Sequence, residues 1–266
     1  MESPKPLRIA AVADLHYDRH AAGKHRALFE AASREADVLL LCGDLTDYGL
    51  EAEAEVLAED LRQHAAVPVL AVLGNHDYEG DQVEGICEAL DRVKVKLLDG
   101  GSCVVGGVGF VGVKGFGGGF GRWALSAWGE APLKAFVQAA VDEALKLDAA
   151  LGRLDTEHQG SHRVALLHYA PIAETVEGEP EVIWPFCGSG RLEDPLDRHG
   201  VAAAFHGHAH AGTPEGRTRG GVPVYNVSIP VLQRAFPERP PFRLFTLDPA
   251  AEPAGALVEA AANGQR

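Results

Sequence analysis

The chain has 266 residues, of which 46% are hydrophobic and 23% charged, a composition typical of a folded protein with a substantial core. Subtracting 38 acidic from 24 basic side chains leaves a formal charge of −14, which repels phosphate backbones, so we expect no nucleic-acid partner. No apolar segment approaches the roughly 18 residues of a membrane span, and the first residues contain no clear signal-cleavage site. We therefore expect a cytoplasmic protein without membrane contact, with one domain over residues 1–248 and a tail over 249–266.

Five short apolar runs end abruptly in polar residues. They cover residues 9–13, 38–41, 69–73, 164–167 and 201–205. Runs of this length, bounded by glycine and polar residues, are typical of strands that are buried on both faces. The gaps between them leave room for helices, so the sequence predicts an alternating β/α fold.

The segment 51–66 has the clearest helical pattern. Ala54, Leu57 and Leu61 recur at helical spacing, while acidic residues occupy the other faces. Similar patterns predict helices over 24–36, 83–93 and 133–151.

The remaining segments predict a second sheet. Residues 100–121 are rich in glycine and contain alternating apolar residues, which predicts a pair of strands followed by a mobile loop over 115–121. Residues 222–229 and 242–247 are predicted to be further strands.

Several polar side chains that follow these strands can bind metal ions. Ligands of open α/β sheets bind beyond the carboxyl ends of the parallel strands, so these side chains are expected to converge. Unpaired carboxylates gathered there would repel one another and would be costly to desolvate, and cations remove that cost. Seven candidate ligands converge in this way: Asp14, His16, Asp44, Asn75, His168, His208 and His210.

The ligand chemistry limits the choice of metal. Carboxylate oxygen together with neutral imidazole nitrogen suits manganese, iron, zinc, cobalt or nickel, whereas magnesium and calcium prefer more oxygen ligands. Seven ligands suffice for two ions if one carboxylate bridges them, and two ions roughly 3.5–4 Å apart are suited to in-line displacement at phosphorus. We expect two such ions, divalent or of mixed valence, with manganese or iron favoured.

The same residues form five ordered motifs: Asp14-Leu15-His16, Gly43-Asp44, Gly74-Asn75-His76-Asp77, His168 and Gly207-His208-Ala209-His210. Together they resemble the calcineurin-like metallophosphoesterase superfamily, in its branch of small bacterial phosphodiesterases and phosphatases. The resemblance implies an α/β fold built as a four-layer αββα sandwich, with two mixed β-sheets flanked by helices. It also implies a metal-dependent hydrolase of phosphoric esters.

The resemblance implies a role for each ligand. One ion would be held by Asp14, His16 and His210, the other by Asn75, His168 and His208, and Asp44 would bridge both. A metal-bridging hydroxide would then be the nucleophile, so no serine or cysteine nucleophile is required.

His76 and Asp77 are the predicted catalytic residues. In similar enzymes the histidine at this position reaches the phosphoryl or leaving-group oxygen, so we expect His76 to act as a general acid or as a transition-state stabiliser. Asp77 is expected to orient His76 through its far ring nitrogen. His206 has no ligand counterpart in the family pattern and is expected to have a packing or supporting role.

The loop between the last two motifs contains candidate substrate contacts. Arg191 is the nearest candidate for a phosphate clamp, and an ordinary ion pair with Glu193 or Asp194 is the alternative. Trp184 is a further candidate in the same loop.

The glycine-rich loop 115–121 is a candidate lid. Phe116, with Lys114, Phe120 and Trp123, would then cover the substrate. The alternative is that these aromatic side chains only anchor the loop.

Departures from relatives narrow the function. Protein Ser/Thr phosphatases of this superfamily carry arginine at the positions of Tyr48 and Leu73, and purple acid phosphatases place a ligating tyrosine at the position of Asp47. The sequence therefore favours a phosphodiesterase acting on small phosphoester or nucleotide-type substrates. A phosphomonoesterase with the same site is the alternative among enzymes, and a non-catalytic scaffold with this fold is the alternative outside them.

Overall fold

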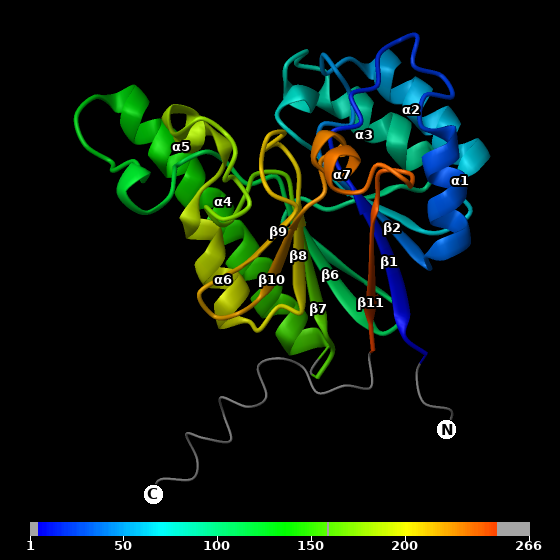
Figure 1. Cartoon of the computed structure of the whole chain (residues 1–266). Helices are drawn as coiled ribbons and strands as arrows, with labels where there is room; N and C mark the ends of the chain where they lie inside the picture. The colour runs from blue at the N-terminus through cyan, green and yellow to red at the C-terminus, as the bar shows by residue number, and fades with distance from the viewer. Residues whose placement is uncertain (1–4, 159, 249–266) are drawn as a thin grey trace, which may run out of the picture.

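The structure is a computed structural model that describes residues 5–158 and 160–248, so the predicted tail lies outside the described residues. Two mixed β-sheets pack face to face, and helices cover both outer faces (Figure 1). The predicted four-layer sandwich is confirmed. No helix among the described residues is both long and apolar enough to cross a membrane.

The first sheet has the strand order β11-β1-β2-β3-β4. β1 to β4 are parallel, and β11 pairs with β1 in the antiparallel direction. The strands are β1 (Leu7–Val12), β2 (Val38–Cys42), β3 (Val69–Val72), β4 (Lys96–Leu97) and β11 (Arg243–Leu247).

The second sheet has the strand order β5-β6-β7-β8-β10-β9. Its four central strands are parallel, and the two edge strands, β5 and β9, are antiparallel to their neighbours. The strands are β5 (Gly101–Val105), β6 (Val108–Val113), β7 (Arg163–Leu167), β8 (Ala203–His206), β9 (Glu215–Arg217) and β10 (Pro223–Asn226).

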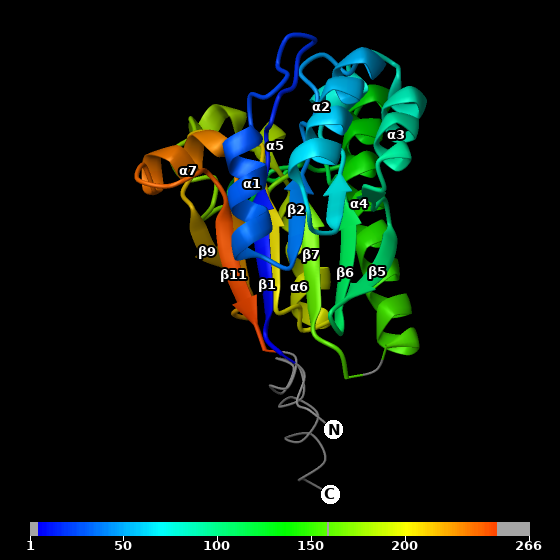
Figure 2. The same ribbon diagram turned by 90° about the vertical axis from the view of Figure 1, so that its right-hand side faces the viewer.

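The longer helices form the outer layers. The first sheet is covered by α1 (Arg26–Glu35), α2 (Glu51–His64) and α3 (Val83–Arg92), and the second by α4 (Ala131–Glu157) and α6 (Glu193–Arg198). The short helices α5 (Trp184–Cys187) and α7 (Ile229–Ala235) lie toward the carboxyl ends of the parallel strands (Figure 2). Four 3₁₀ turns complete the elements: η1 (His76–Tyr78), η2 (Gly121–Trp123), η3 (Glu181–Ile183) and η4 (Gly190–Leu192).

Each central strand contributes to two different cores. In β1, Ala10 and Val12 pack with the helices of the first outer layer, whereas Ile9 and Ala11 pack between the two sheets. Both faces of the strand are therefore buried. This explains why the predicted strands are apolar throughout instead of alternating with polar residues.

The segment 222–229 differs from its prediction. It is not one strand, because β10 ends at Asn226 and α7 begins at Ile229. Ser228 has the extended conformation of a residue before a helix, and Pro230 occupies the first turn, where its missing N–H and fixed φ suit a helix start. The short elements β4, β9, α5 and α6 were not predicted, because segments of two to six residues are too short to show a hydrophobic period.

The core between the sheets yields a stability prediction. Phe205 on β8 is fully buried, and its ring centroid lies 5.3 Å from that of Tyr225 and 5.8 Å from that of Phe245 in the other sheet. Phe205→Ala should lower the free energy of unfolding by about 3–5 kcal/mol, because it removes apolar contacts and leaves a cavity. Val104 on β5 is 40% exposed, and Val104→Ala is the control, expected to change stability by less than about 0.5 kcal/mol in chemical denaturation. Equal losses in the two variants would contradict this packing.

Candidate active site

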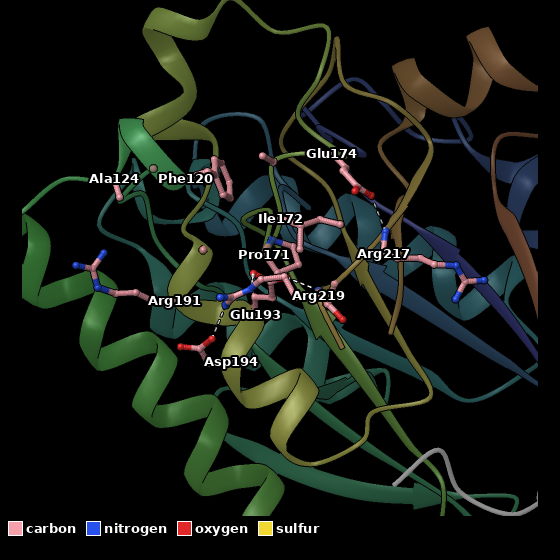
Figure 3. A pocket seen from close by; sticks show the side chains of 15 residues that line it. Phe120, Ala124, Pro171, Ile172, Glu174, Arg191, Glu193, Asp194, Arg217 and Arg219 are labelled. Carbon is pink, nitrogen blue, oxygen red and sulfur yellow. Dashed lines mark hydrogen bonds and ion pairs between the residues drawn. The ribbon is translucent and has the colours of Figure 1, made fainter. Parts of the chain in front are cut away.

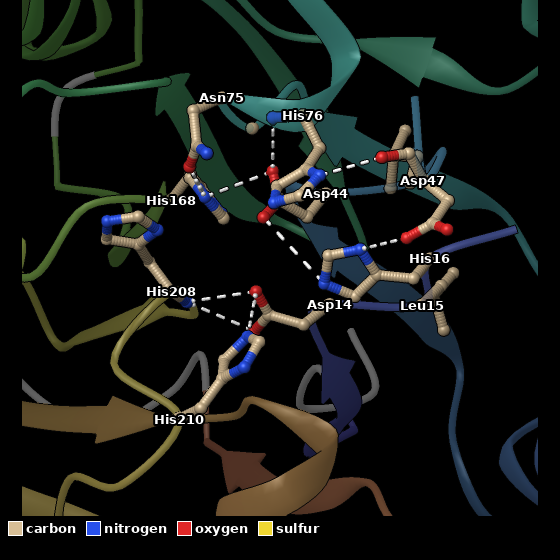
Figure 4. Close-up of polar contacts among 12 residues, drawn as sticks. Asp14, Leu15, His16, Asp44, Asp47, Asn75, His76, His168, His208 and His210 are labelled. Atoms are coloured by element: carbon tan, nitrogen blue, oxygen red, sulfur yellow. Dashed lines mark hydrogen bonds and ion pairs between the residues drawn. The ribbon is translucent and has the colours of Figure 1, made fainter. Parts of the chain in front are cut away.

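All seven predicted ligands lie in loops that follow the carboxyl ends of strands (Figure 4). Both sheets contribute, so the site lies where the two sheets meet. Asp14, His16, Asp44 and Asn75 follow strands of the first sheet, and His168, His208 and His210 follow strands of the second.

One group of ligating atoms is formed by Asp14, His16 and His210, whose atoms lie within 4.8 Å of one another. Nε2 of His210 is 3.1 Å from Oδ1 of Asp14. The Asp14 carboxylate is buried and also accepts a hydrogen bond from the backbone N–H of His208, at 3.1 Å. The backbone of the last motif is thereby fixed against the first.

A second group with the same spacing is formed by Asp44, His168 and His208. Nε2 of His168 lies 3.3 Å from Oδ1 of Asp44 and 2.9 Å from Oδ1 of Asn75, which brings Asn75 into this group. The other oxygen of Asp44, Oδ2, faces Nε2 of His16 in the first group at 3.9 Å. The Asp44 carboxylate thus lies between the two groups.

Backbone carbonyls determine which nitrogen of two histidines is available. Nδ1 of His168 lies 3.0 Å from the carbonyl oxygen of Cys42, and Nε2 of His208 lies 3.0 Å from that of Phe186. A carbonyl oxygen only accepts hydrogen bonds, so these nitrogens carry a proton, and the opposite ring nitrogen is the one that could bind a metal ion once it is not protonated. Such hydrogen bonds are typical of metal-binding histidines.

His16 shows that the donor set fits a metal ion. Both of its ring nitrogens are buried and have no hydrogen-bond partner among the described residues. Nδ1 lies 3.2 Å from Oδ1 of Asp47, and Nε2 faces Asp44. Leaving a buried polar atom unsatisfied is costly, and a cation between His16, Asp14 and Asp44 would satisfy Nε2 and neutralise the carboxylates.

The backbone is strained at the same positions. Four of the seven predicted ligands have a left-handed φ: Asp14 at 62°, His16 at 43°, Asp44 at 49° and His208 at 69°. Only two other non-glycine residues in the described part of the chain have φ in this region. The conformation costs roughly 1–3 kcal/mol for each residue, and such strain is typical of functional sites.

Burial and charge shift the pKa values of the predicted ligands in different directions. Burial lowers the pKa of His208 to about 4 and also lowers that of His16, so both are neutral near pH 7. In the buried pair Asp44 and His168, burial opposes both charges, but their attraction holds the pKa of Asp44 below its ordinary range and raises that of His168. Asp44 therefore remains a carboxylate.

His76 is half-buried beside the ligands, with its ring centroid 4.7 Å from that of His16. Its backbone N–H donates to Oδ1 of Asp44 at 2.9 Å, and its Nδ1 lies 2.7 Å from the carbonyl oxygen of Asp47. This carbonyl can only accept, so Nδ1 carries a proton and Nε2 is left to contact a substrate. Burial lowers the pKa of His76, but the Asp47 carbonyl and the Asp44 charge outweigh it, and the pKa is raised.

Asp77 does not orient His76, and this corrects our expectation. Its fully buried carboxylate accepts hydrogen bonds from three backbone N–H groups of two neighbouring loops and from the hydroxyl of Thr46, at 2.6–3.2 Å. These bonds tie the loop after β2 to the loop after β3 and use both carboxylate oxygens. The group that holds the His76 ring is the Asp47 carbonyl.

Asp47 is a site residue that the sequence motifs did not predict. Its carboxylate contacts His16 and its carbonyl contacts His76, so one residue holds both rings. Its position could have indicated this role, because Asp47 follows Asp44 by three residues, in a turn that has to lie beside the Asp14-Leu15-His16 motif.

His206 has the supporting role that we predicted. It is fully buried, with Nε2 2.8 Å from the hydroxyl oxygen of Thr175 and Nδ1 2.8 Å from the carbonyl oxygen of Gly207. Both nitrogens are thus occupied by the protein.

Arg191 does not form the alternative ion pair with Glu193 or Asp194 among the described residues. It lines a pocket of about 640 Å³ to which none of the predicted ligands contributes, and its side chain turns away from Arg219 (Figure 3). Its guanidinium donates to the carbonyl oxygen of Leu125 at 3.3 Å. Glu193 and Asp194 instead pair with Arg219, at 3.0 and 2.7 Å.

Trp184 and Phe116 each contact other aromatic side chains. Trp184 donates its indole N–H to a backbone carbonyl at 3.1 Å, and its ring centroid lies 6.4 Å from that of Phe120. The ring of Phe116 lies 4.9 Å from that of Phe136 and 5.8 Å from that of Tyr169.

The loop 115–121 is tied down, which corrects the expected mobility. The N–H groups of Gly118 and Gly119 donate to the carbonyls of Pro185 and Gly188, at 2.7 and 2.8 Å. Most of the loop is buried. The anchoring alternative therefore describes this loop better than a lid.

Comparison with known proteins supports the same fold and family. The sequence model of a family described as calcineurin-like phosphoesterase matches residues 7–212. Phosphopantetheinyl hydrolase (PptH) from Mycobacterium tuberculosis has a similar structure, with a TM-score of 0.65 and 17% identity, over 94% of this chain and 99% of that one. The protein TT1561 of Thermus thermophilus is similar with a TM-score of 0.59 and 17% identity, over 92% and 99% of the two chains. A search of curated protein sequences gave no significant match.

Asp47→Asn tests the support of His16. The change removes the carboxylate charge beside Nδ1 of His16 but keeps the backbone carbonyl that holds His76. Loss of such a partner typically weakens metal affinity by about 10–100-fold, which competition with a chelator would measure for Mn²⁺ and Zn²⁺. Asp142→Asn, on the exposed face of α4, is the charge-matched control and should bind metal like the wild type. Equal affinities in the two variants would refute the role of Asp47.

Gly74→Ala tests the close packing of two motifs. A Cβ at Gly74 would overlap the carboxylate and the backbone nitrogen of Asp44. Because Asp44 lies between both groups of ligands, we expect the variant to bind metal at least about tenfold more weakly, with a stability loss of about 1–3 kcal/mol. Gly101→Ala, where a Cβ meets open space, is the control. Metal content by mass spectrometry and thermal unfolding would measure both effects, and wild-type metal content in Gly74→Ala would contradict the geometry.

Proposed function

The chain belongs to the calcineurin-like phosphoesterase family of metal-dependent phosphoesterases, and on this basis we propose that it uses two metal ions to hydrolyse small phosphodiesters. The observation that carries the proposal is the pair of ligand groups, Asp14-His16-His210 and Asp44-His168-His208, with Asp44 between them. Each group of ligands could hold one ion by itself. Because the Asp44 carboxylate faces both groups, we propose that the two ions form one dinuclear centre.

The chain's own donors support this centre. Asp14, His16 and His210 would hold one ion, and Asn75, His168 and His208 the other, with manganese or iron favoured by the mixture of oxygen and nitrogen ligands. When bound, such ions supply Lewis acidity and lower the pKa of water. We also propose that residues 1–248 work as one domain, because the two sheets supply different ligands of the same centre.

His76 is the proposed proton donor. Its Nδ1 is held by the Asp47 carbonyl, so Nε2 is the nitrogen that can reach a leaving-group oxygen. Its raised pKa increases the protonated fraction near neutral pH. A histidine placed in this way would protonate the alcohol as it departs.

The side chains at two positions support diesters over monoesters. Where protein phosphatases of this family place arginine, this chain has Tyr48, which is 60% exposed, and the buried Leu73. A monoester dianion carries more charge than a diester, and neither side chain can neutralise it. The overall charge of −14 disfavours nucleic acid as a substrate. We also propose that the protein is cytoplasmic, as the sequence predicts.

The name of one structural neighbour supports hydrolysis of an organic phosphate ester as the reaction class. The phosphopantetheinyl hydrolase shares the fold with this chain at 17% identity.

Metal reconstitution tests the function. The metal-free protein would be loaded separately with manganese, iron, zinc, cobalt or nickel and assayed with bis-p-nitrophenyl phosphate and p-nitrophenyl phosphate. We expect hydrolysis of both, with the higher kcat/KM for the diester. A preference for the monoester would instead support a phosphomonoesterase, and no turnover of either substrate with any ion would support the scaffold alternative.

His76→Gln tests the proton donor. We expect kcat to fall by about 10²–10⁴-fold at wild-type metal content, which is the usual contribution of general acid catalysis. The loss should be larger for a diester with an alkyl leaving group than for one with p-nitrophenolate, because the latter departs without a proton. His20→Gln, in an exposed loop, is the control. An equal loss with both leaving groups would reject proton donation by His76.

A further inference from the structure

Lys114 follows β6 in the same way that the predicted ligands follow their own strands. β6 pairs with β7, and the carbonyl oxygen of Lys114 accepts hydrogen bonds from the N–H groups of His168 and Tyr169, both at 3.0 Å. Lys114 is thus part of the frame that holds His168, although it contributes no ligating atom.

The ammonium group of Lys114 lies in an aromatic enclosure. Nζ is 4.9 Å from the ring centroid of Phe116, 5.1 Å from that of Tyr169 and 5.5 Å from that of Tyr78. It donates to the carbonyl oxygen of Gly115 at 3.0 Å. Within the described part of the chain, no carboxylate lies within 4.0 Å of this ammonium. The rings attract the cation but cannot accept all of its N–H donors.

The two nearby acidic side chains are already used. Glu143 accepts from Nζ of Lys146 at 2.6 Å and from the backbone N–H of Gly115 at 2.8 Å. Asp99 pairs with the same Lys146 at 2.7 Å. The charge of Lys114 therefore has no dedicated protein counter-ion among the residues that the structure describes.

Lys114 lines a small pocket next to the site. The pocket has a volume of about 120 Å³, and most of its wall is apolar, from Leu73, Val83 and Leu97 among others. Its other lining residues include Tyr78, Lys114 and Asp99, whose carboxylate pairs with Lys146. Water occupies about 30 Å³ per molecule in the liquid, so the pocket admits one carboxylate or phosphate group with a short linker.

Two residues that line the pocket are close in sequence to predicted site residues. Leu73 and Tyr78 flank the segment 74–77 that contains Asn75 and His76. On the other side, the ring centroid of Tyr169 lies 4.5 Å from that of His208. The ring of Tyr169 thus lies close both to the Lys114 ammonium and to the ring of a predicted ligand.

We propose that Lys114 and this pocket bind a second anionic group of the substrate, a carboxylate or a phosphate on the alcohol that is not the leaving group. The inference rests on the proposed function for the reaction, but it makes a separate claim about binding. It makes Lys114 a specificity-determining residue, and it identifies the substrates as diesters with a charged arm.

The experiment compares three p-nitrophenyl diesters whose second alcohol carries an ethyl, a carboxymethyl or a 2-phosphonoethyl group. The manganese-loaded wild type should show a kcat/KM at least about tenfold higher for one or both charged diesters than for the ethyl diester, as expected for a charge-assisted hydrogen bond. Lys114→Met should reduce that ratio to about one, and Lys114→Arg should keep part of it. Lys134→Met, on the exposed face of α4, removes the same charge elsewhere and should keep the wild-type ratio.

A binding measurement separates failure of this inference from failure of the proposed function. Calorimetric titration of the metal-free protein with phosphonoacetate and with ethylphosphonate should show tighter binding of phosphonoacetate in the wild type and no preference in Lys114→Met. That result supports the pocket even if no diester is hydrolysed. A wild type without preference in either assay, or a Lys114→Met variant that is weaker with every compound but keeps the wild-type ratio, would overturn it.

Discussion

The Asp44 carboxylate is the contact on which the arrangement of the site depends. One of its oxygens faces His168 from the second sheet, and the other faces His16 from the first. A carboxylate can take this position only if the ends of β2 and β7 meet, which the apolar core between the sheets enforces. The geometry of the centre therefore depends on the packing of the two sheets. The same packing stabilises the strained backbone at Asp14, His16, Asp44 and His208.

The sequence was sufficient to predict the fold and the convergence of the seven candidate ligands, because both depend on simple patterns. A strand buried on both faces is apolar along its whole length, so its end is marked sharply by the first polar residue, as at Asp14 after β1. Parallel strands bring such ends to one edge, and the chemistry of the gathered side chains then limits the ion.

The contacts of single side chains could not be predicted in the same way. Asp47 and Asp77 both lie three residues or fewer from a central residue of the site, and only the turn geometry decides that Asp77 points into the loops while Asp47 holds His16 and His76. An ion pair of Arg191 with Glu193 or Asp194 was predicted from their closeness in sequence. The structure shows that Arg219, which is distant in sequence, pairs with both acids instead. Short elements such as β9 carry too few residues to show a period.

The pairing of β11 with β1 has a consequence for how the centre is assembled. Leu7 pairs with Leu247 and Ala11 with Arg243, so the strand that leads to Asp14 and His16 is completed by a segment more than two hundred positions later. Loop-closure entropy makes such distant pairing slow. During synthesis on the ribosome, the first sheet therefore stays open along one edge of β1, the strand that leads to Asp14 and His16, until β11 has emerged.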